Sequence, residues 1–271
     1  MGGRHVAVDA PDFDTQSVGG IPLAAPLTDR QIASAVLLHD QLGGWNATDK
    51  ALALVAARFP EIDYEATLIK VATVNQLYGT NLYAVHRMAA HLADTLSQTN
   101  LAQRGDSLAD AVLVEHLANL PRAPGQQQPR RHISFASKFA HFFIDLDRFP
   151  IYDSHAVQTV AYHLGSHGRV VDRVHPYQAF VLNLNALKER AALTCTWMEL
   201  DRYLWLAGQL RAWNSNKTAH VNAEVPALFA NPSPTTEAEL TILASGSQPH
   251  PYPDSVCPEH QSGGIIDHRP V

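Results

Sequence analysis

The sequence contains little cysteine, and its longest apolar runs are short. Only Cys195 and Cys257 occur in 271 residues. Two cysteines cannot build the disulfide framework of a small secreted domain or the four-cysteine ligand set of an iron–sulfur cluster, so we expect neither, and a reducing, cytoplasmic location. No run of eighteen apolar residues exists, and the first residues lack the apolar stretch of a signal peptide. We therefore expect no membrane partner.

The chain also lacks an excess of positive charge, with a formal net charge of −6. Nucleic-acid-binding domains are commonly basic, so the total charge argues mildly against such a partner. The acidic residues gather toward the ends, however, with six acidic residues and one basic residue in 218–271. Residues 61–217 hold fourteen acidic and fifteen basic residues, so this central part is nearly neutral and can carry a local basic face.

Apolar residues recur at helical spacing along most of the chain, which predicts an all-α domain. Gly, Pro and Asp dominate 1–27, which we interpret as a loose N-terminal arm, and the many Pro, Ser and Thr residues of 216–271 predict a tail without fixed structure. The helical domain is then 28–215, with Gly43-Gly44 expected to end its first helix. Caps, breakers and periodicity place helices over 29–42, 48–59, 63–77, 81–96, 107–120, 134–144, 154–164, 175–191 and 196–213.

One segment carries recognisable chemistry, HISFASKFAHFFIDLDRFPIYDSHA over residues 132–156. Its SFASKFA lies over the G-V-G-x-K-x-A of a helix-hairpin-helix motif, and its FPIYD over the F-P-I-L-D that precedes a helix in adenine-specific glycosylases. The segment therefore resembles the helix-hairpin-helix DNA glycosylase superfamily. The lysine is similar to that of the bifunctional branch, which includes endonuclease III and 8-oxoguanine DNA glycosylase.

Two further segments agree with this resemblance in the same order along the chain. LIKVATVNQLYGTNL over 68–82 is similar to the family's early helix, which ends in a turn whose Gln or Asn fills the gap left by an extruded base. Gln76 or Asn81 takes that place here. YLWLAGQLRAW over 203–213 is similar to the late helix behind the catalytic loop. The resemblance covers about 61–214 and implies a two-lobed helical fold that binds DNA.

The resemblance assigns catalysis to Lys138 and Asp153. A base must leave the duplex before its glycosidic bond can be cut, and the cleavage passes through an oxocarbenium-like transition state. Lys138 would attack the sugar as a neutral amine, and burial among phenylalanines near a helix start would lower its pKa. Asp153 would stabilise the positive charge that develops on the sugar, from a position beside the N-terminus of the next helix.

The hairpin would also hold a DNA phosphate through its backbone. Ser134, Ala136 and Ser137 occupy that turn, with Arg130 and Arg131 just before it. Both glycines of the family's hairpin are replaced, by serine and alanine, and glycine is the residue that allows a tight turn and close approach to phosphate. The spacing from Lys138 to Asp153 is also about one helical turn shorter than in the family.

Two alternatives to a DNA glycosylase remain open at this stage. The chain could be a glycosylase-fold protein without catalysis that binds nucleic acid or a protein partner, for example in bacterial defence, or a helical scaffold that shares only packing with the family. The fifteen histidines do not have the spacing of a metal-ligand set, so we expect no metal. No nucleotide-binding fingerprint or other cofactor motif is present.

Overall fold

The computed structural model describes residues 21–101, 107–121, 131–215 and 223–245, and these residues fold into helices without strands. The all-α prediction is therefore confirmed for this part of the chain. Its β-type pairing is one isolated bridge between Asn119 and Arg131. The helices are α1 (Asp29–His39), α2 (Gly43–Arg58), α3 (Tyr64–Tyr78), α4 (Val85–Ser97), α5 (Ser107–Ala118), α6 (Ile133–Phe143), α7 (Ser154–Leu164), α8 (Pro176–Arg190), α9 (Trp197–Ser215), α10 (Glu224–Ala230) and α11 (Pro234–Ala244).

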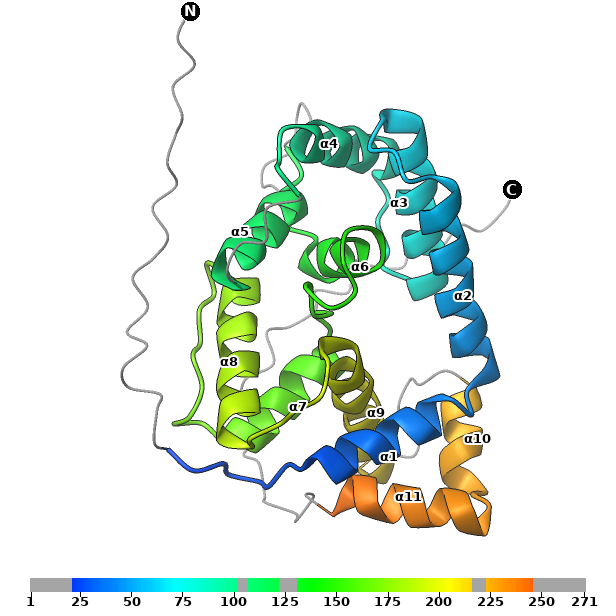
Figure 1. Ribbon diagram of the computed structural model, residues 1–271, viewed down its shortest axis with the longest axis vertical. Coiled ribbons are helices and arrows are strands. Elements are labelled where there is room, and N and C mark those ends of the chain that lie inside the picture. The colour runs from blue at the N-terminus through cyan, green and yellow to red at the C-terminus, as the bar shows by residue number, and fades with distance from the viewer. Residues whose placement is uncertain (1–20, 102–106, 122–130, 216–222, 246–271) are drawn as a thin grey trace, which may run out of the picture.

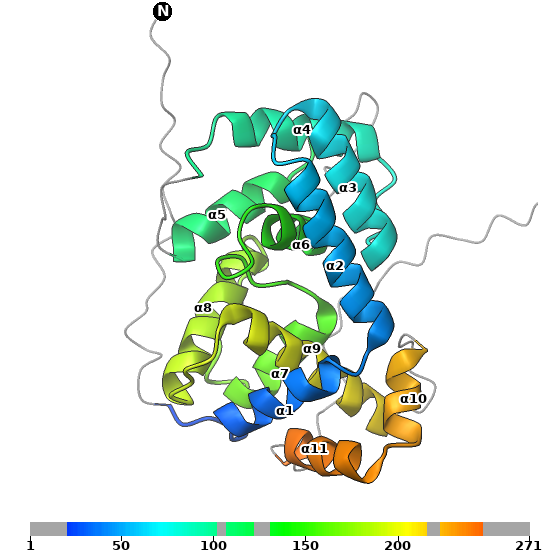
Figure 2. The same ribbon diagram turned by 45° about the vertical axis from the view of Figure 1, so that its right-hand side comes forward.

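Helix α6 lies near the centre of the molecule, whereas α10 and α11 lie at its lower end in these views (Figures 1 and 2). It packs against α5 on one side and against α2 and α3 on the other. Helices α1, α7, α8 and α9 form the layer next to it, with α7 and α1 both packed on α9. A central helix must be apolar on most of its faces, and Phe135, Ala136 and Phe139 of α6 are at most 1% exposed.

Several helices begin where a short polar side chain accepts a backbone hydrogen bond. Asp63 and Asp153 accept from the third residue of α3 and of α7 at 2.8 Å each, which satisfies one of the amides that a helix start leaves open. Gly165, at φ 71°, follows the last residue of α7 in a conformation that favours glycine. These two signals explain why the predicted range 154–164 is confirmed as α7.

The prediction that Gly43-Gly44 ends the first helix is wrong. Helix α1 stops at His39, and the two glycines instead begin α2. The Gly44 N–H donates to the Glu224 carboxylate at 2.7 Å, and a Cβ on Gly44 would lie 3.0 Å from that same side chain. The glycine therefore permits the close approach of α10, a contact from far along the chain that local spacing cannot reveal.

The predicted boundaries of the helical domain, 28 and 215, are also wrong for the described residues outside them. Helices α10 and α11 occupy part of the segment predicted to be a tail, and α11 packs on α1, where Arg30 and Glu239 form an ion pair at 3.0 Å. At the other end, the Ala24 N–H donates to the His163 carbonyl at 2.8 Å, and Ala25 and Leu27 are buried. Both additions cover α1, α7 or α9, whose apolar faces would otherwise be exposed.

None of the helices in the described ranges is long and apolar enough to cross a membrane.

Candidate functional site

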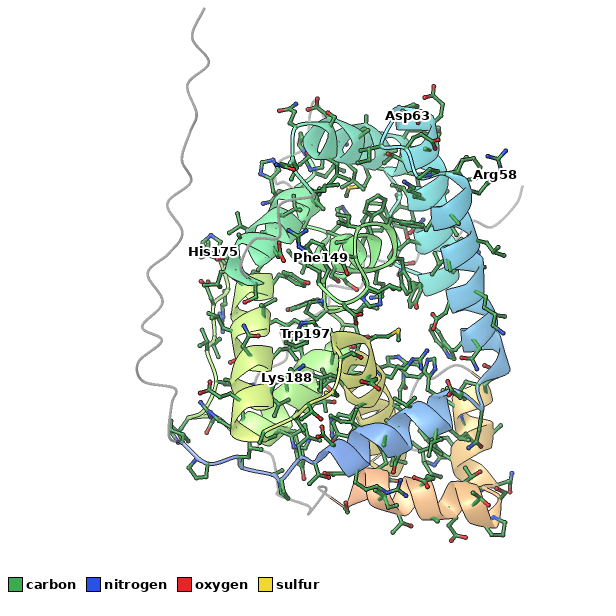
Figure 3. All side chains as sticks on the ribbon, viewed as in Figure 1. Arg58, Asp63, Phe149, His175, Lys188 and Trp197 are labelled. Atoms are coloured by element: carbon green, nitrogen blue, oxygen red, sulfur yellow. The ribbon has the colours of Figure 1, made fainter. Side chains whose placement is uncertain are left out.

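The loop between α6 and α7 carries Asp153, and hydrogen bonds fix it along its length. The Phe149 carbonyl accepts from His141 Nδ1 at 2.9 Å, and the Pro150 carbonyl accepts from the Tyr177 hydroxyl at 2.8 Å. The Tyr152 N–H donates to Ser137 Oγ at 3.0 Å. Figure 3 shows Phe149 near the centre of the molecule, with Trp197 at the start of α9 below it in that view. The loop therefore has little freedom, and Asp153 has a defined position.

Lys138 lies on α6, and its side chain is buried, with 6% of the residue exposed. Its amine donates to Ser134 Oγ at 2.7 Å and lies 5.7 Å from the centre of the Tyr78 ring. Burial lowers the pKa of the Lys138 amine, and the negative charges of Asp153 and Asp201 oppose that shift. Burial therefore acts on the Lys138 pKa in the predicted direction. Lys138 lies in the second turn of α6, however, and not at the start of the helix.

Two carboxylates from different helices act on this amine. Asp153 precedes α7 and is half-buried, while Asp201 lies in the second turn of α9 and is also half-buried. Burial raises the pKa of Asp201 well above its usual range, the charge of Asp153 raises it further, and Lys138 and a hydrogen bond from the Ile151 N–H lower it. Asp201 is therefore protonated at pH values where an ordinary aspartate is ionised.

Tyr78 and Asp49 extend this cluster toward α2 and α3. Burial raises the pKa of the Tyr78 hydroxyl, as do the charges of Asp49 and Asp201, and the hydroxyl lies 3.4 Å from the Asp49 carboxylate. Burial also raises the pKa of Asp49, which the nearby Arg202 partly offsets. We call Lys138, Asp153, Asp201, Asp49 and Tyr78 the acid–amine cluster. It joins an amine with a lowered pKa to an acid with a raised pKa, the two protonation states that proton transfer requires.

Aromatic rings from three helices cover the α2 side of the acid–amine cluster. The rings of Trp45 and Tyr78 lie 5.5 Å apart, and those of Trp45 and Trp205 lie 4.9 Å apart. Trp45 Nε1 is buried and has no hydrogen-bond partner within the described residues. A buried donor without an acceptor costs free energy, so this wall can accept a hydrogen-bonding group of a flat ligand.

The residues predicted to form the hairpin turn instead lie in the first turns of α6. Ser134 is half-buried and accepts from the Lys138 amine, Ala136 is fully buried, and Ser137 anchors Tyr152. The helix predicted over 134–144 is confirmed as α6, and Ser134 and Ala136, which replace the two glycines of the family's hairpin, adopt helical geometry there. In this position Ser137 supports Asp153 rather than facing a phosphate.

Arg131 is committed to contacts within the protein. Its guanidinium pairs with the buried Glu115 and donates to the Val174 carbonyl. The other carboxylate oxygen of Glu115 accepts from the Tyr177 N–H at 2.7 Å, at the start of α8. Arg131 thus joins the ends of α5, α6 and α8, and Arg130 lies outside the described residues.

Gln76 lies in the last turn of α3, and Asn81 lies in the loop that follows the helix, three residues after Tyr78. Both side chains are exposed, and Asn81 has φ 53°, a left-handed conformation that asparagine tolerates. Asn75 fixes their turn, since its Oδ1 accepts from the Leu82 N–H and the Thr80 hydroxyl at 2.8 Å each. These hydrogen bonds hold the turn, and the two side chains are exposed to solvent.

Asp201 was not recognised in the sequence, although a signal exists. Trp197, Leu204, Trp205 and Gly208 lie three, four or seven residues from it, so an acidic residue interrupts an apolar helical face. An acid in that setting calls for a partner, and the Lys138 amine of α6 is one. The partner is identified only in the folded chain, where the charges of Lys138 and Asp201 act on each other.

The sequence of this chain is similar to one family model and to a protein of Haemophilus influenzae. Residues 31–147 match a family model described as HI_0787_N, N-terminal domain, which includes Lys138 and ends before Asp153. An uncharacterized protein of Haemophilus influenzae is 26% identical over 151 residues, which span 54% of this chain and 67% of that protein. No solved structure matches.

Proposed function

We propose that this protein cleaves the N-glycosidic bond of a damaged or modified base in DNA. The observation that carries the proposal is the acid–amine cluster, in which the buried Lys138 amine shares its surroundings with Asp153 and Asp201. The family resemblance of residues 132–156 connects that chemistry to DNA. The exposed, rigid turn at Gln76 and Asn81 supports it by offering side chains that can occupy the gap left by an extruded base.

The chemistry follows from the protonation states. The neutral Lys138 amine attacks the anomeric carbon as the bond to the base breaks, and the base leaves with the bonding electron pair. Asp201, whose pKa is raised, can donate a proton to the departing base. Asp153 stabilises the positive charge on the sugar during this step. The bond between the anomeric carbon and the ring oxygen then breaks, the ring oxygen takes a proton from the Lys138 nitrogen, and a protonated imine joins Lys138 to the opened sugar, the intermediate of a glycosylase that also cleaves abasic sites.

Reductive trapping tests this proposal. Wild-type protein is incubated with borohydride and duplexes that each carry one oxidised, deaminated or alkylated base, and covalent complexes are separated on denaturing gels. We expect a complex with at least one duplex and none with Lys138→Gln. Lys70→Gln is the matched control, because Lys70 is a second buried lysine whose amine donates to the Glu61 carbonyl at 2.7 Å. Failure of the wild type to cross-link with every duplex would reject the lyase-type mechanism.

A second function is favoured by the burial of Lys138. With 6% of the residue exposed, a nucleotide reaches the amine only if neighbouring side chains move. A non-catalytic, glycosylase-fold protein that binds nucleic acid or another protein would retain the same buried amine without that requirement. Salt-dependent DNA binding without base release from any duplex of the panel would support this accessory function.

A further inference from the structure

The connection between α7 and α8 is an exposed basic segment, which we call the basic loop and define as residues 166–175. His167, Arg169 and Arg173 are exposed, and neither arginine has a hydrogen-bond or ion-pair partner among the residues that the structure describes. The loop contains one acid, Asp172, whose carboxylate accepts from the Val174 and His175 N–H groups at 2.6 and 3.0 Å. The Asp172 carboxylate is therefore occupied by hydrogen bonds within the loop, whereas both arginines are exposed to solvent.

The basic loop is held in one shape by contacts on both sides. The Asn183 side chain accepts from the Val170 N–H at 2.7 Å and donates to the Val170 carbonyl at 2.8 Å. Arg131 donates to the Val174 carbonyl. Gly168 permits the close return of the chain, since a Cβ there would lie 2.3 Å from the Leu164 carbonyl oxygen. The arginines therefore project from a fixed backbone, which reduces the entropy lost when they bind.

Two apolar side chains stand between these charges. Val171 is 69% exposed and Val174 is 64% exposed, the highest values for valine in the described residues. Such an alternation of cationic and apolar groups suits the nucleic-acid backbone, which alternates anionic phosphates with the apolar faces of sugars. The formal charge of the whole chain is −6, so this local positive charge runs against the composition.

The basic loop is also connected to the acid–amine cluster. Val174 contacts Arg131, Arg131 pairs with Glu115, and Glu115 accepts from Tyr177, whose hydroxyl reaches the Pro150 carbonyl. One tyrosine side chain thus separates the start of α8 from the loop that carries Asp153. Figure 3 shows His175 at the edge of the molecule and Phe149 of the α6–α7 loop further inside.

We propose that the basic loop binds phosphates of the DNA strand that flanks the nucleotide held at the acid–amine cluster. This inference rests on the proposed function. Arg169 and Arg173 contact the backbone and carry no base preference, because phosphates report no sequence directly. The loop would supply a phosphate contact in place of Arg131, whose guanidinium pairs with Glu115 within the protein.

Salt-dependent binding tests the inference. Fluorescence anisotropy of a labelled 25-base-pair duplex with a central abasic-site analogue is measured with the full chain between 50 and 300 mM KCl. For Arg169→Gln/Arg173→Gln we expect binding at 50 mM KCl to weaken by about tenfold or more, and the slope of log K against log salt to fall by about 2, one for each phosphate contact. Lys50→Gln/Arg58→Gln is the matched control, with two exposed cations of α2 removed, and it should retain the wild-type slope.

The outcomes separate this inference from the proposed function. If the double arginine variant keeps the wild-type slope while Lys138→Gln loses trapping, the basic loop proposal fails and the glycosylase proposal stands. If the slope falls as expected but no duplex is cleaved, the loop binds DNA and the accessory function is favoured. Equal competition by polyglutamate and duplex DNA at matched charge would overturn the proposal, because the loop would then serve acidic proteins.

Discussion

Two buried lysines, each beside an aspartate that caps a helix, occupy different parts of this molecule. Lys70 and Asp63 lie on α3, and Lys138 on α6 lies near Asp153 at the start of α7. Burial lowers the pKa of both amines, and each amine lies over an aromatic ring, 5.8 Å from Phe143 for Lys70 and 5.7 Å from Tyr78 for Lys138. The two pairs are thus alike in residue type, in capping geometry and in the direction of the pKa shift.

They differ in what surrounds them. The acids near Lys70, Glu61 and Asp63, are exposed, and its amine is held by the Glu61 carbonyl. Lys138 instead faces acids from two other helices, and one of them, Asp201, has a raised pKa. Burying an amine beside an acid that stays protonated does not stabilise the fold as an ion pair would. The proposed function assigns a chemical role to Lys138 on the basis of this difference, and a structural role to Lys70.

The sharpest separation of the two lysines uses arginine. Arginine keeps the positive charge and cannot supply a neutral amine at ordinary pH. We expect Lys138→Arg to reduce single-turnover base release by about a thousandfold or more, the scale of loss when a covalent nucleophile is removed. Lys70→Arg should keep wild-type rates. Thermal unfolding of both variants checks that they fold, and substantial activity in folded Lys138→Arg would make Lys138 a charge rather than a nucleophile.

The two capping aspartates give a closely matched second test. Asparagine also caps helices well, so Asp63→Asn and Asp153→Asn should each change the free energy of unfolding by less than about 0.5 kcal/mol. Removing the charge of Asp153 should nevertheless slow base release by about a hundredfold or more, because its carboxylate opposes positive charge on the sugar. Single-turnover rates and urea unfolding are measured together. Equal rates in the two variants would remove Asp153 from the mechanism.

The hydrogen bond from Tyr152 to Ser137 sharpens the comparison, since Asp153 depends on that support. Ser137→Ala leaves the Tyr152 N–H without its acceptor, which should cost about 1–2 kcal/mol in urea unfolding and slow base release about tenfold. Ser97→Ala is the control, because the Ser97 hydroxyl is exposed and donates to the Asp94 carbonyl of its own helix. Unchanged rates in Ser137→Ala would show that the loop holds Asp153 without this bond.

The raised pKa of Asp201 predicts that the stability of the protein depends on pH. Its pKa is raised in the folded protein above the ordinary value of 3.8, so the folded state retains a proton that the unfolded chain releases. The stability contributed by the protonated acid is complete below pH 3.8 and is lost as pH rises toward the folded pKa. Relative to Asp201→Asn, the wild type should therefore lose about 1 kcal/mol or more from pH 4 upward.

Thermal unfolding at several pH values measures this difference. Leu200→Ala, at the fully buried neighbouring position on α9, is the control for a loss of stability that carries no titration. Its difference from the wild type should stay constant over the same pH range. A constant difference for Asp201→Asn as well would contradict the raised pKa of Asp201.

The sequence predicts most of this fold because local signals decide most helix ends. Asp153 and Gly165 delimit α7 without help from the rest of the chain. The prediction for Gly43-Gly44 is wrong because a distant residue decides the structure there: Glu224 contacts Gly44 from 180 residues away. Helices α10 and α11 were missed because prolines and serines dominate their surroundings, although Ser233 caps α11 and Pro234 begins it.

The candidate site divides in the same way. Lys138 and Asp153 are recognisable because they lie fifteen residues apart in one motif. The sequence marks Asp201 only as an acid on an apolar helical face, and its interaction with Lys138 and Asp153 depends on the tertiary fold. In the sequence Arg131 is a typical candidate for a phosphate contact. In the structure it forms an ion pair with the buried Glu115. Local capping can be read from the chain, whereas the neighbour of a charged side chain depends on tertiary packing.

The location of the covalent bond tests the account most directly. Wild-type protein trapped with borohydride on a cleaved duplex is digested with nuclease and protease, and the modified peptide is sequenced by mass spectrometry. The account predicts one sugar-derived adduct, on the Lys138 side chain. An adduct on Lys70, on another lysine or on the N-terminal amine, with Lys138 unmodified, would contradict it.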